Sequence, residues 1–298
     1  MEWTLRVVSP LFLTGALKTQ PEFRAPSVRG QLRYWLRAIT GAATDRLSEV
    51  WSHESQVFGS TEVGQGVTIR LYGPPPKTGR VLMLPHREEE RRRAPAPAIL
   101  VNQKAILQLV TRPGQTIPQQ AENAVRVWAA LGGLGKRSRR MFGAFDLTGR
   151  GETAWMSRPT SPDELAQQIK TTLAAAVNSK SSLYTNGLPP FPTLHPRHSW
   201  VIVGRQGFDD PQEANIDLFR NLLRTNRFRP KEQTFGQAVG GRRASPLIAQ
   251  VRLVGDQYYP ILTALRSRPD RRIDWDHLKM FMQVAAEHYN AETVWGGW

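Results

Sequence analysis

The order in which hydrophobic periodicity changes over the first half of the chain places the strongest constraint on its fold. Apolar and polar residues alternate over 3–8, 67–72, 105–111 and 142–147, which predicts four strands. Apolar residues with helical spacing lie between the first and second strands and between the third and fourth, which predicts a helix in each place. This strand–helix–strand–strand–helix–strand order is typical of the ferredoxin-like fold, so the sequence predicts an α+β domain of that type.

The first predicted helix carries an apolar stripe and a basic stripe. Its apolar side is predicted to consist of Val28, Leu32, Trp35, Leu36 and Ile39. Ser27 is the expected N-cap and Gly41 the expected end. Three arginines step by four beside the apolar side, namely Arg29, Arg33 and Arg37, and Arg24 extends the same surface upstream. A solvated helix face is the alternative, but the charge of the whole chain favours contact with RNA phosphates.

A second basic element follows the second predicted helix, in a stretch with glycines at 132, 133, 135 and 143. Its candidate RNA-binding residues are Lys136, Arg137, Ser138, Arg139 and Arg140. Glycine lets a backbone approach a ligand closely, and the arginine fork matches phosphate geometry. The alternative is a helix C-cap followed by a solvated basic turn. The spacing of the glycines is neither that of a nucleotide P-loop nor that of a Rossmann motif.

The second half has a less regular pattern. Helices are predicted over 163–177, 215–226 and 273–289, a strand over 200–203, and a hairpin of 248–254 with 258–265. We therefore expect a boundary near residue 150, with domains 1–150 and 151–298. Phe58-Gly59 and Phe235-Gly236 each precede a glycine-containing stretch and a strand, which indicates a duplicated fold.

Composition narrows the functional class. The chain has 298 residues and a formal net charge of +15, which favours a polyanionic partner, with nucleic acid as the default. It has no cysteine, so disulfides, thiolate zinc sites and cysteine nucleophiles are excluded. No apolar run is long enough for a membrane span and the N-terminus does not resemble a signal peptide. We expect a cytoplasmic protein with no membrane partner.

Four segments carry a resemblance to a known family. They are Glu22-Phe-Arg-Ala-Pro-Ser-Val-Arg-Gly-Gln-Leu-Arg-Tyr-Trp-Leu-Arg-Ala38, Phe58-Gly-Ser60, the glycine–arginine stretch and Arg243-Ala-Ser-Pro-Leu247. Together they resemble the RAMP superfamily of CRISPR proteins, and more narrowly the first-subunit family of the type III-B (Cmr) effector complex. The resemblance is strong over residues 1–150 and scattered afterwards.

The resemblance has several implications. It implies tandem ferredoxin-like domains, the second more irregular, in a subunit that works in antiviral defence. The implied partners are guide RNA (crRNA), contacted near its 3′ end, the paired target RNA, and other RAMP subunits of the complex. Arg242 and Arg243 join the candidate RNA-binding residues. No catalytic residue, metal or cofactor is expected.

Catalysis remains the competing hypothesis. The repeated backbone subunit of such complexes cuts target RNA with an Asp between the first strand and first helix, whereas residues 11–26 here contain only Glu22 as an acid. A RAMP-type endoribonuclease that processes guide precursors would instead use a histidine as general acid or base. His195 and His198 are the nearest pair, in a proline-rich loop. Asp274 and Asp276 are better explained by a helix N-terminus than by a metal site.

Two further features stay open. The excursion from Gly73 to Pro97 is either a thumb that wedges into a guide–target duplex, as in RAMP backbone subunits, or a solvent loop. Trp295 and Trp298 at the chain's end are expected to pack on the protein itself or on a neighbouring subunit, because indole rings are amphipathic and costly to leave exposed.

Overall fold

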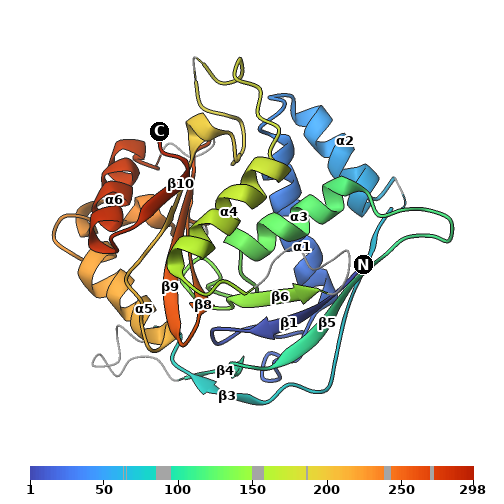
Figure 1. The fold of residues 1–298 in the computed structure, drawn as a ribbon, viewed down its shortest axis with the longest axis horizontal. Coiled ribbons are helices and arrows are strands. Elements are labelled where there is room, and N and C mark those ends of the chain that lie inside the picture. Colours follow the sequence, from blue (N-terminus) through green and yellow to red (C-terminus); the bar gives the residue numbers. More distant parts are fainter. Residues whose placement is uncertain are drawn as a thin grey trace.

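The computed structural model describes residues 1–62, 64, 66–84, 95–149, 158–185, 187–237, 243–268 and 272–298. Within them the chain forms two four-stranded antiparallel sheets and a separate two-stranded ribbon, with helices packed on the sheets (Figure 1). The structure therefore confirms a mixed α and β architecture with antiparallel sheets. None of its described helices is long and apolar enough to cross a membrane.

The first sheet contains the four strands that the alternating pattern predicts. They are β1 (Glu2–Val7), β2 (Thr68–Tyr72), β5 (Lys104–Val110) and β6 (Phe145–Gly149), in the order β2-β5-β1-β6. Trp3, Leu5 and Val7 point into the core. The fourth strand begins at Phe145 rather than at Phe142, because Met141 and Gly143 have positive φ angles that an extended strand does not adopt.

Helices α1 (Ala25–Thr40) and α3 (Gln119–Leu131) pack together on one face of this sheet, and α2 (Leu47–Phe58) packs on α1. The predicted apolar stripe of α1 is confirmed, with Trp35 only 1% exposed. The prediction that Ser27 caps α1 is wrong, because the helix begins at Ala25 after Arg24, and Pro26 occupies its first turn. Proline suits that position since its missing N–H would have no helical partner there. Gly41 is the C-cap, as predicted.

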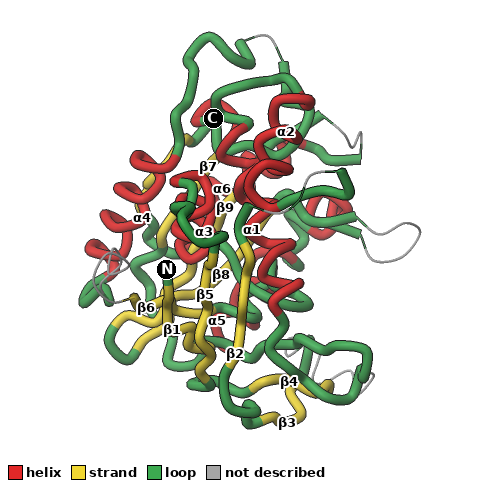
Figure 2. Tube along the Cα trace, turned by 90° about the vertical axis from the view of Figure 1, so that its right-hand side faces the viewer, coloured by secondary structure: helices red, strands yellow, loops and turns green. Residues whose placement is uncertain are grey.

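The proline-rich excursion is in part a packed ribbon. Strands β3 (Thr78–Val81) and β4 (Ala96–Ile99) pair, and Ile99 also bridges to Leu11. Phe12 and Phe142, with ring centroids 5.0 Å apart, pack with Ala98 beneath the ribbon. Residues 85–94 lie outside the described residues. The ribbon lies at the end of the molecule away from α2 (Figure 2).

The second half builds a sheet with the same strand order. Its elements are α4 (Pro162–Ala176), β7 (Ser199–Val203), α5 (Pro211–Asp217), β8 (Leu247–Val254), β9 (Gln257–Leu265), α6 (Trp275–His288) and β10 (Glu292–Gly296), with short helical turns at Pro196–His198, Leu218–Leu223 and Arg229–Phe235. The order β10-β7-β9-β8 places the last, first, third and second strand of the half side by side, as in the first sheet.

Most elements of this half agree with the sequence. Ser161 caps α4 and Asp274 caps α6, and the β8–β9 hairpin turns at Gly255. The helix predicted over 215–226 begins earlier, at Pro211, because the Asp210 side chain caps it. Strand β10 was not predicted.

The two halves share a core. The largest buried cluster joins Trp3 and Trp128 of the first half to Leu165 and Val201 of the second. Helix α4 lies beside α3 and also packs on β10 (Figure 1). The domain boundary near residue 150 stays a prediction, since residues 150–157 are outside the described part.

Candidate nucleic-acid interface

Three basic stretches that are far apart in the sequence meet around Arg139. Its guanidinium carbon lies 5.0 Å from the centroid of the Tyr34 ring, on helix α1. The same guanidinium donates a hydrogen bond to the carbonyl oxygen of Ser245, in the segment before β8. The structure therefore places the arginine helix, the glycine–arginine loop and the Arg243–Leu247 segment next to one another.

The glycine–arginine loop, residues 132–143, runs between the two halves. The Lys136 N–H donates to the Phe12 carbonyl at 2.8 Å, and the Met141 N–H donates to the Ala249 carbonyl of β8 at 2.8 Å. Gly143 is required because its φ is +62° and a Cβ there would lie 1.8 Å from the Leu134 carbonyl oxygen. The loop thus extends the edge of the second sheet while it remains anchored to the first half.

Arg140 is engaged inside the protein. One terminal nitrogen donates to the carbonyl oxygens of Arg139 at 2.7 Å and Leu247 at 3.2 Å, and the other donates to the Phe235 carbonyl. Burial, and secondarily the charges of Arg137 and Arg139, lower the pKa of Arg140. These contacts give Arg140 a structural role, and its contact with RNA stays a prediction.

The neighbours of Arg140 in the loop differ in exposure. Lys136 is exposed, whereas Arg137 is half-buried with its guanidinium 6.0 Å from the Phe219 ring centroid. The Ser138 carbonyl accepts a hydrogen bond from the buried side chain of Gln250. Lys136 is therefore the loop cation best placed to meet a ligand from solvent, and RNA contact by the loop residues stays a prediction.

A second internal arginine, Arg252, was not singled out from the sequence. It is only 4% exposed. Its guanidinium donates to the carbonyl oxygen of Ala129, near the end of α3, and to that of Gly132 at 3.0 Å. Burial lowers the pKa of Arg252, with the Asp146 carboxylate acting in the opposite direction. Nothing in the local sequence shows that an arginine in a strand satisfies the last carbonyls of a helix 120 residues earlier.

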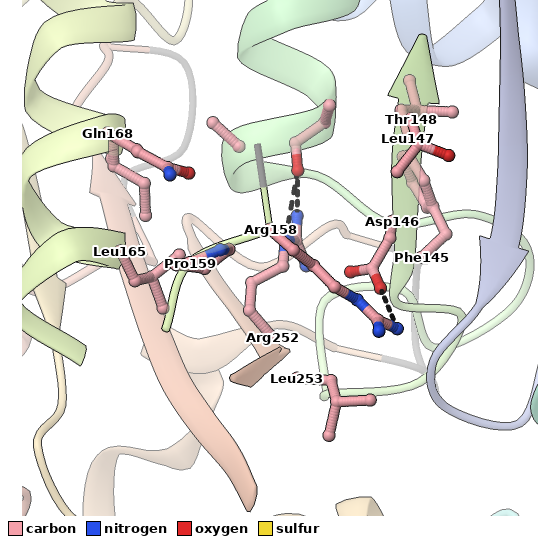
Figure 3. Close-up of a pocket in the computed structure, with 13 residues that line it drawn as sticks. Phe145, Asp146, Leu147, Thr148, Arg158, Pro159, Leu165, Gln168, Arg252 and Leu253 are labelled. Atoms are coloured by element: carbon pink, nitrogen blue, oxygen red, sulfur yellow. Dashed lines mark hydrogen bonds and ion pairs between the residues drawn. The ribbon is translucent and has the colours of Figure 1, made fainter. Parts of the chain in front are cut away.

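A pocket beside Arg252 is too small for a nucleotide. It has a volume of about 30 Å³ and lies between α3, β6, α4 and β8 (Figure 3). Asp146 in its wall pairs with Arg6 at 2.7 Å, and Arg158 approaches the same carboxylate at 3.8 Å. Burial raises the pKa of Asp146 despite the nearby Arg6. A space of this size suits a water molecule, so we assign the pocket to the packing of the two halves.

The arginine stripe of α1 lies along helix α2. Arg33 and Arg37 both pair with Glu54, whose side chain is 6% exposed, and the Arg37–Glu54 distance is 2.8 Å. Arg29 donates to the Phe58 carbonyl at the end of α2. The side chains of Arg33 and Arg37 remain 30% and 38% exposed. The stripe is therefore held in place by α2 while part of its charge faces solvent.

An open hollow lies at the N-terminal end of this stripe. It is lined by Pro26, Arg29, Gly30, Arg33, Gly59, Ser60 and Thr61. Gly30 is exposed in the middle of α1, and a Cβ added there would meet no atom within 4 Å. Arg24, upstream, pairs with Glu22 at 3.3 Å and donates to the Thr14 carbonyl at 3.2 Å. A polymer backbone approaching α1 would meet two arginines and no bulky side chain at Gly30.

In each half, the phenylalanine of the repeated Phe-Gly pair accepts a hydrogen bond from an arginine. The carbonyl of Phe58 accepts from Arg29, and the carbonyl of Phe235 accepts from Arg140. Gly59 and Gly236 follow with φ angles of +75° and +111°. Arg243 lies nearby and its backbone pairs with Gln237, whereas Arg242 is outside the described residues.

The histidines considered for catalysis make internal contacts. His195 Nε2 lies 3.0 Å from the Lys180 carbonyl and its Nδ1 accepts from the Arg197 N–H. His198 Nε2 lies 3.3 Å from the Tyr184 carbonyl, and burial lowers its pKa. In the described part of the chain, no group of three or more His, Asp or Glu side chains could hold a metal ion.

Comparison with known proteins identifies the relatives of this architecture. Residues 4–146 match the family model of the RAMP superfamily. The Cmr subunit Cmr1-1 of the CRISPR system of Pyrococcus furiosus is 23% identical over 333 aligned residues, covering 98% of this chain and 96% of that protein. The chain resembles Cmr1. The resemblance to RAMP proteins inferred from the sequence is thereby confirmed.

Other relatives extend the comparison. Cmr1-2 of the same organism is 36% identical over 81 residues, which are 26% of this chain and 42% of that protein. The crystal structure of apo Cmr1 from P. furiosus superposes with a TM-score of 0.72 at 22% identity, covering 100% of this chain and 99% of that one. A chain in a cryo-EM structure of the type III-B Cmr-beta complex bound to cognate target RNA reaches a TM-score of 0.62 at 10% identity, covering 95% and 98% of the two chains. At these identities the two structures show a shared fold.

Proposed function

We propose that this chain is a non-catalytic RNA-binding subunit of a type III-B (Cmr) CRISPR effector complex, acting in the cytoplasm in antiviral defence. Its ligands are guide RNA, near the 3′ end, and the paired target RNA, and its partners are other RAMP subunits. The observation that carries the proposal is the meeting of the three basic stretches at Arg139. The similarity to Cmr1-1 and to a chain of a Cmr complex bound to target RNA supports it.

The proposal includes a tandem ferredoxin-like fold. The matching strand orders of the two sheets support a duplicated βαββαβ unit, with α4 added before the second copy. In this arrangement RNA lies along the hollow at Arg29, Gly30 and Arg33. The exposed Lys136 of the glycine–arginine loop is a further cation for its phosphates. Phosphate contacts of this kind position RNA without reading its sequence, which suits a subunit that must accept any guide.

Substitutions at Gly30 test whether RNA passes over the hollow. Gly30→Glu places a carboxylate among the arginines and should weaken RNA binding roughly tenfold or more, whereas Gly30→Lys should preserve or strengthen it. Because each phosphate contact releases counterions, Gly30→Lys should also steepen the dependence of log K on log salt by about one unit. Affinity is measured with the purified chain and single-stranded RNA over a range of salt concentrations.

The control for these variants is Gly30→Ala. Since a Cβ at Gly30 meets no atom within 4 Å, all three substitutions should fold, and alanine should favour the helix. Equal RNA affinity for the Glu and Lys variants would show that RNA does not approach α1 at this place.

The absence of nuclease activity is a separate expectation. We expect the purified chain to cleave neither guide precursor nor complementary target RNA, with or without divalent metal. Glu22 is paired with Arg24, and His195 and His198 contact backbone carbonyls, so each candidate general base already has a partner within the chain. Gel analysis of labelled RNA after incubation measures this. Specific cuts that vanish in His195→Ala, His198→Ala or Glu22→Gln, at unchanged binding, would establish the nuclease alternative.

A further inference from the structure

Helix α2 has one face that is packed at one end and open at the other. Leu47, Trp51, Glu54 and Phe58 are spaced by four, three and four residues, which places them on a single stripe of the helix. Phe58 is fully buried and Glu54 is 4% exposed, but Leu47 is 42% and Trp51 is 62% exposed. Trp51 is the most exposed large apolar side chain of the described residues. Trp51 and Leu47 therefore leave a small apolar area open to solvent at the N-terminal end of α2, and an exposed indole offers a flat ring face to a ligand.

The open end of this face lies beside cations. Trp51 precedes Glu54 by three residues, about 4.5 Å along the helix axis, and Arg33 and Arg37 converge on the Glu54 carboxylate. Both arginines keep exposed surface, and one carboxylate neutralises only one of the two charges. Arg46, the residue before α2, has a side chain that is 75% exposed and pairs with Glu49 at 3.0 Å.

We propose that Trp51 is a stacking platform for one base of a single-stranded RNA segment whose phosphates lie on Arg33 and Arg37. This inference rests on the proposed RNA-binding function and assigns that function a base contact. An exposed aromatic ring next to arginines is the combination by which proteins hold single-stranded nucleic acid without reading its sequence. The stacked base covers the indole face, and the adjoining phosphate takes the guanidinium charge that Glu54 leaves unneutralised.

The size and surroundings of the open face favour a base over a protein partner. The exposed residues next to Trp51 on α2 are polar, namely Ser48, Ser52, His53 and Gln56, so the apolar area is limited to Trp51 and Leu47. Stable protein interfaces have a larger apolar centre with few charges in it. One base ring matches the available apolar surface, and the cationic flank complements its phosphate.

The test compares Trp51→Ala, Trp51→Phe and Leu47→Ala in the full-length chain. For a short single-stranded RNA, Trp51→Ala should weaken binding by about 5- to 150-fold, the range expected for the loss of one stacked base. The salt dependence should keep the wild-type slope, because no phosphate contact is removed. Trp51→Phe should retain most of the affinity, Leu47→Ala should resemble wild type, and binding to duplex RNA should be the same for all variants.

The outcomes separate this inference from the proposed function. Wild-type affinity of Trp51→Ala for single-stranded RNA, with the Gly30 variants behaving as expected, would overturn the stacking role alone. If Trp51→Ala and Leu47→Ala bind RNA normally but lose co-purifying Cmr subunits, the face is a protein-docking surface and the inference is wrong. Failure of the wild-type chain to bind any RNA would overturn both. Because Trp51 is exposed, its variants should melt like wild type, which thermal unfolding checks.

Discussion

Replacement of Trp35 by alanine should lower the free energy of unfolding by about 3–5 kcal/mol, the cost of removing a large aromatic side chain from a core. Trp35 is 1% exposed on the buried side of α1, edge-on to the Tyr34 ring at a centroid distance of 5.3 Å. A Cβ on Gly132 would lie 2.7 Å from the indole nitrogen, so the end of α3 packs directly on the ring. Chemical denaturation of the purified variant measures the loss.

The matched control is Arg33→Ala on the neighbouring face of the same helix. Its side chain is 30% exposed, and Glu54 keeps Arg37 as a partner when Arg33 is removed, so the loss of stability should be much smaller. Trp35→Phe should lie between the two, because most of the ring volume is retained. A Trp35→Ala protein that unfolds at the wild-type denaturant concentration would contradict the packing of α1 against α3.

Elements with a strong period were predictable from the sequence, because burial itself imposes the period. The alternation of Trp3, Leu5 and Val7 gives β1 its buried face, and the spacing from Val28 to Ile39 gives the phase of α1. The N-cap Asp274 was also predictable, because its side chain accepts a hydrogen bond from an N–H only three residues later, at His277.

Helix α2 and strand β10 were missed for physical reasons. In α2 the polar Glu54 is buried and the apolar Trp51 is exposed. The spacing of its apolar residues therefore does not mark the buried face of a helix. Strand β10 is short and ends in a glycine, and its pairing with β7 depends on a partner about 90 residues earlier in the chain. Trp298 packs on Trp200 with centroids 5.7 Å apart, a contact that only the assembled sheet creates.

The basic segments were recognisable in the sequence, but their arrangement and the partners of each arginine were not. Each segment contains arginine, and the structure places α1, the glycine–arginine loop and the Arg243–Leu247 segment next to one another. Which arginine faces solvent depends on distant carbonyl groups. Arg139 and Arg140 look alike in the sequence, yet their partners, Ser245, Leu247 and Phe235, lie 95 to 107 residues away. Long-range hydrogen bonds of this kind leave no local pattern.

Arg140→Ala should destabilise the protein by about 2–5 kcal/mol, because the carbonyl oxygens of Phe235 and Leu247 lose a charged donor in a buried place. Arg140→Lys should recover only part of this loss, since an ammonium group lacks the planar fork that reaches carbonyls on two segments at once. Thermal and denaturant unfolding of both variants measures the effect.

The same variants decide between a structural and a phosphate-binding Arg140. If the guanidinium contacts RNA chiefly as a charge, Arg140→Lys will keep the wild-type salt slope of RNA binding, and Arg140→Ala will flatten it without a loss of stability. The internal contacts of Arg140 favour the structural outcome over the RNA contact predicted from the sequence: stability should fall in both variants, and the salt slope of RNA binding should keep its wild-type value.

Lys136→Ala is the control from the same loop. Lys136 is exposed and only its backbone contacts Phe12, so its removal should flatten the salt slope by up to about one unit at unchanged stability. The opposite responses of Lys136 and Arg140 would separate the loop cation that meets RNA from the one that joins the two halves of the chain.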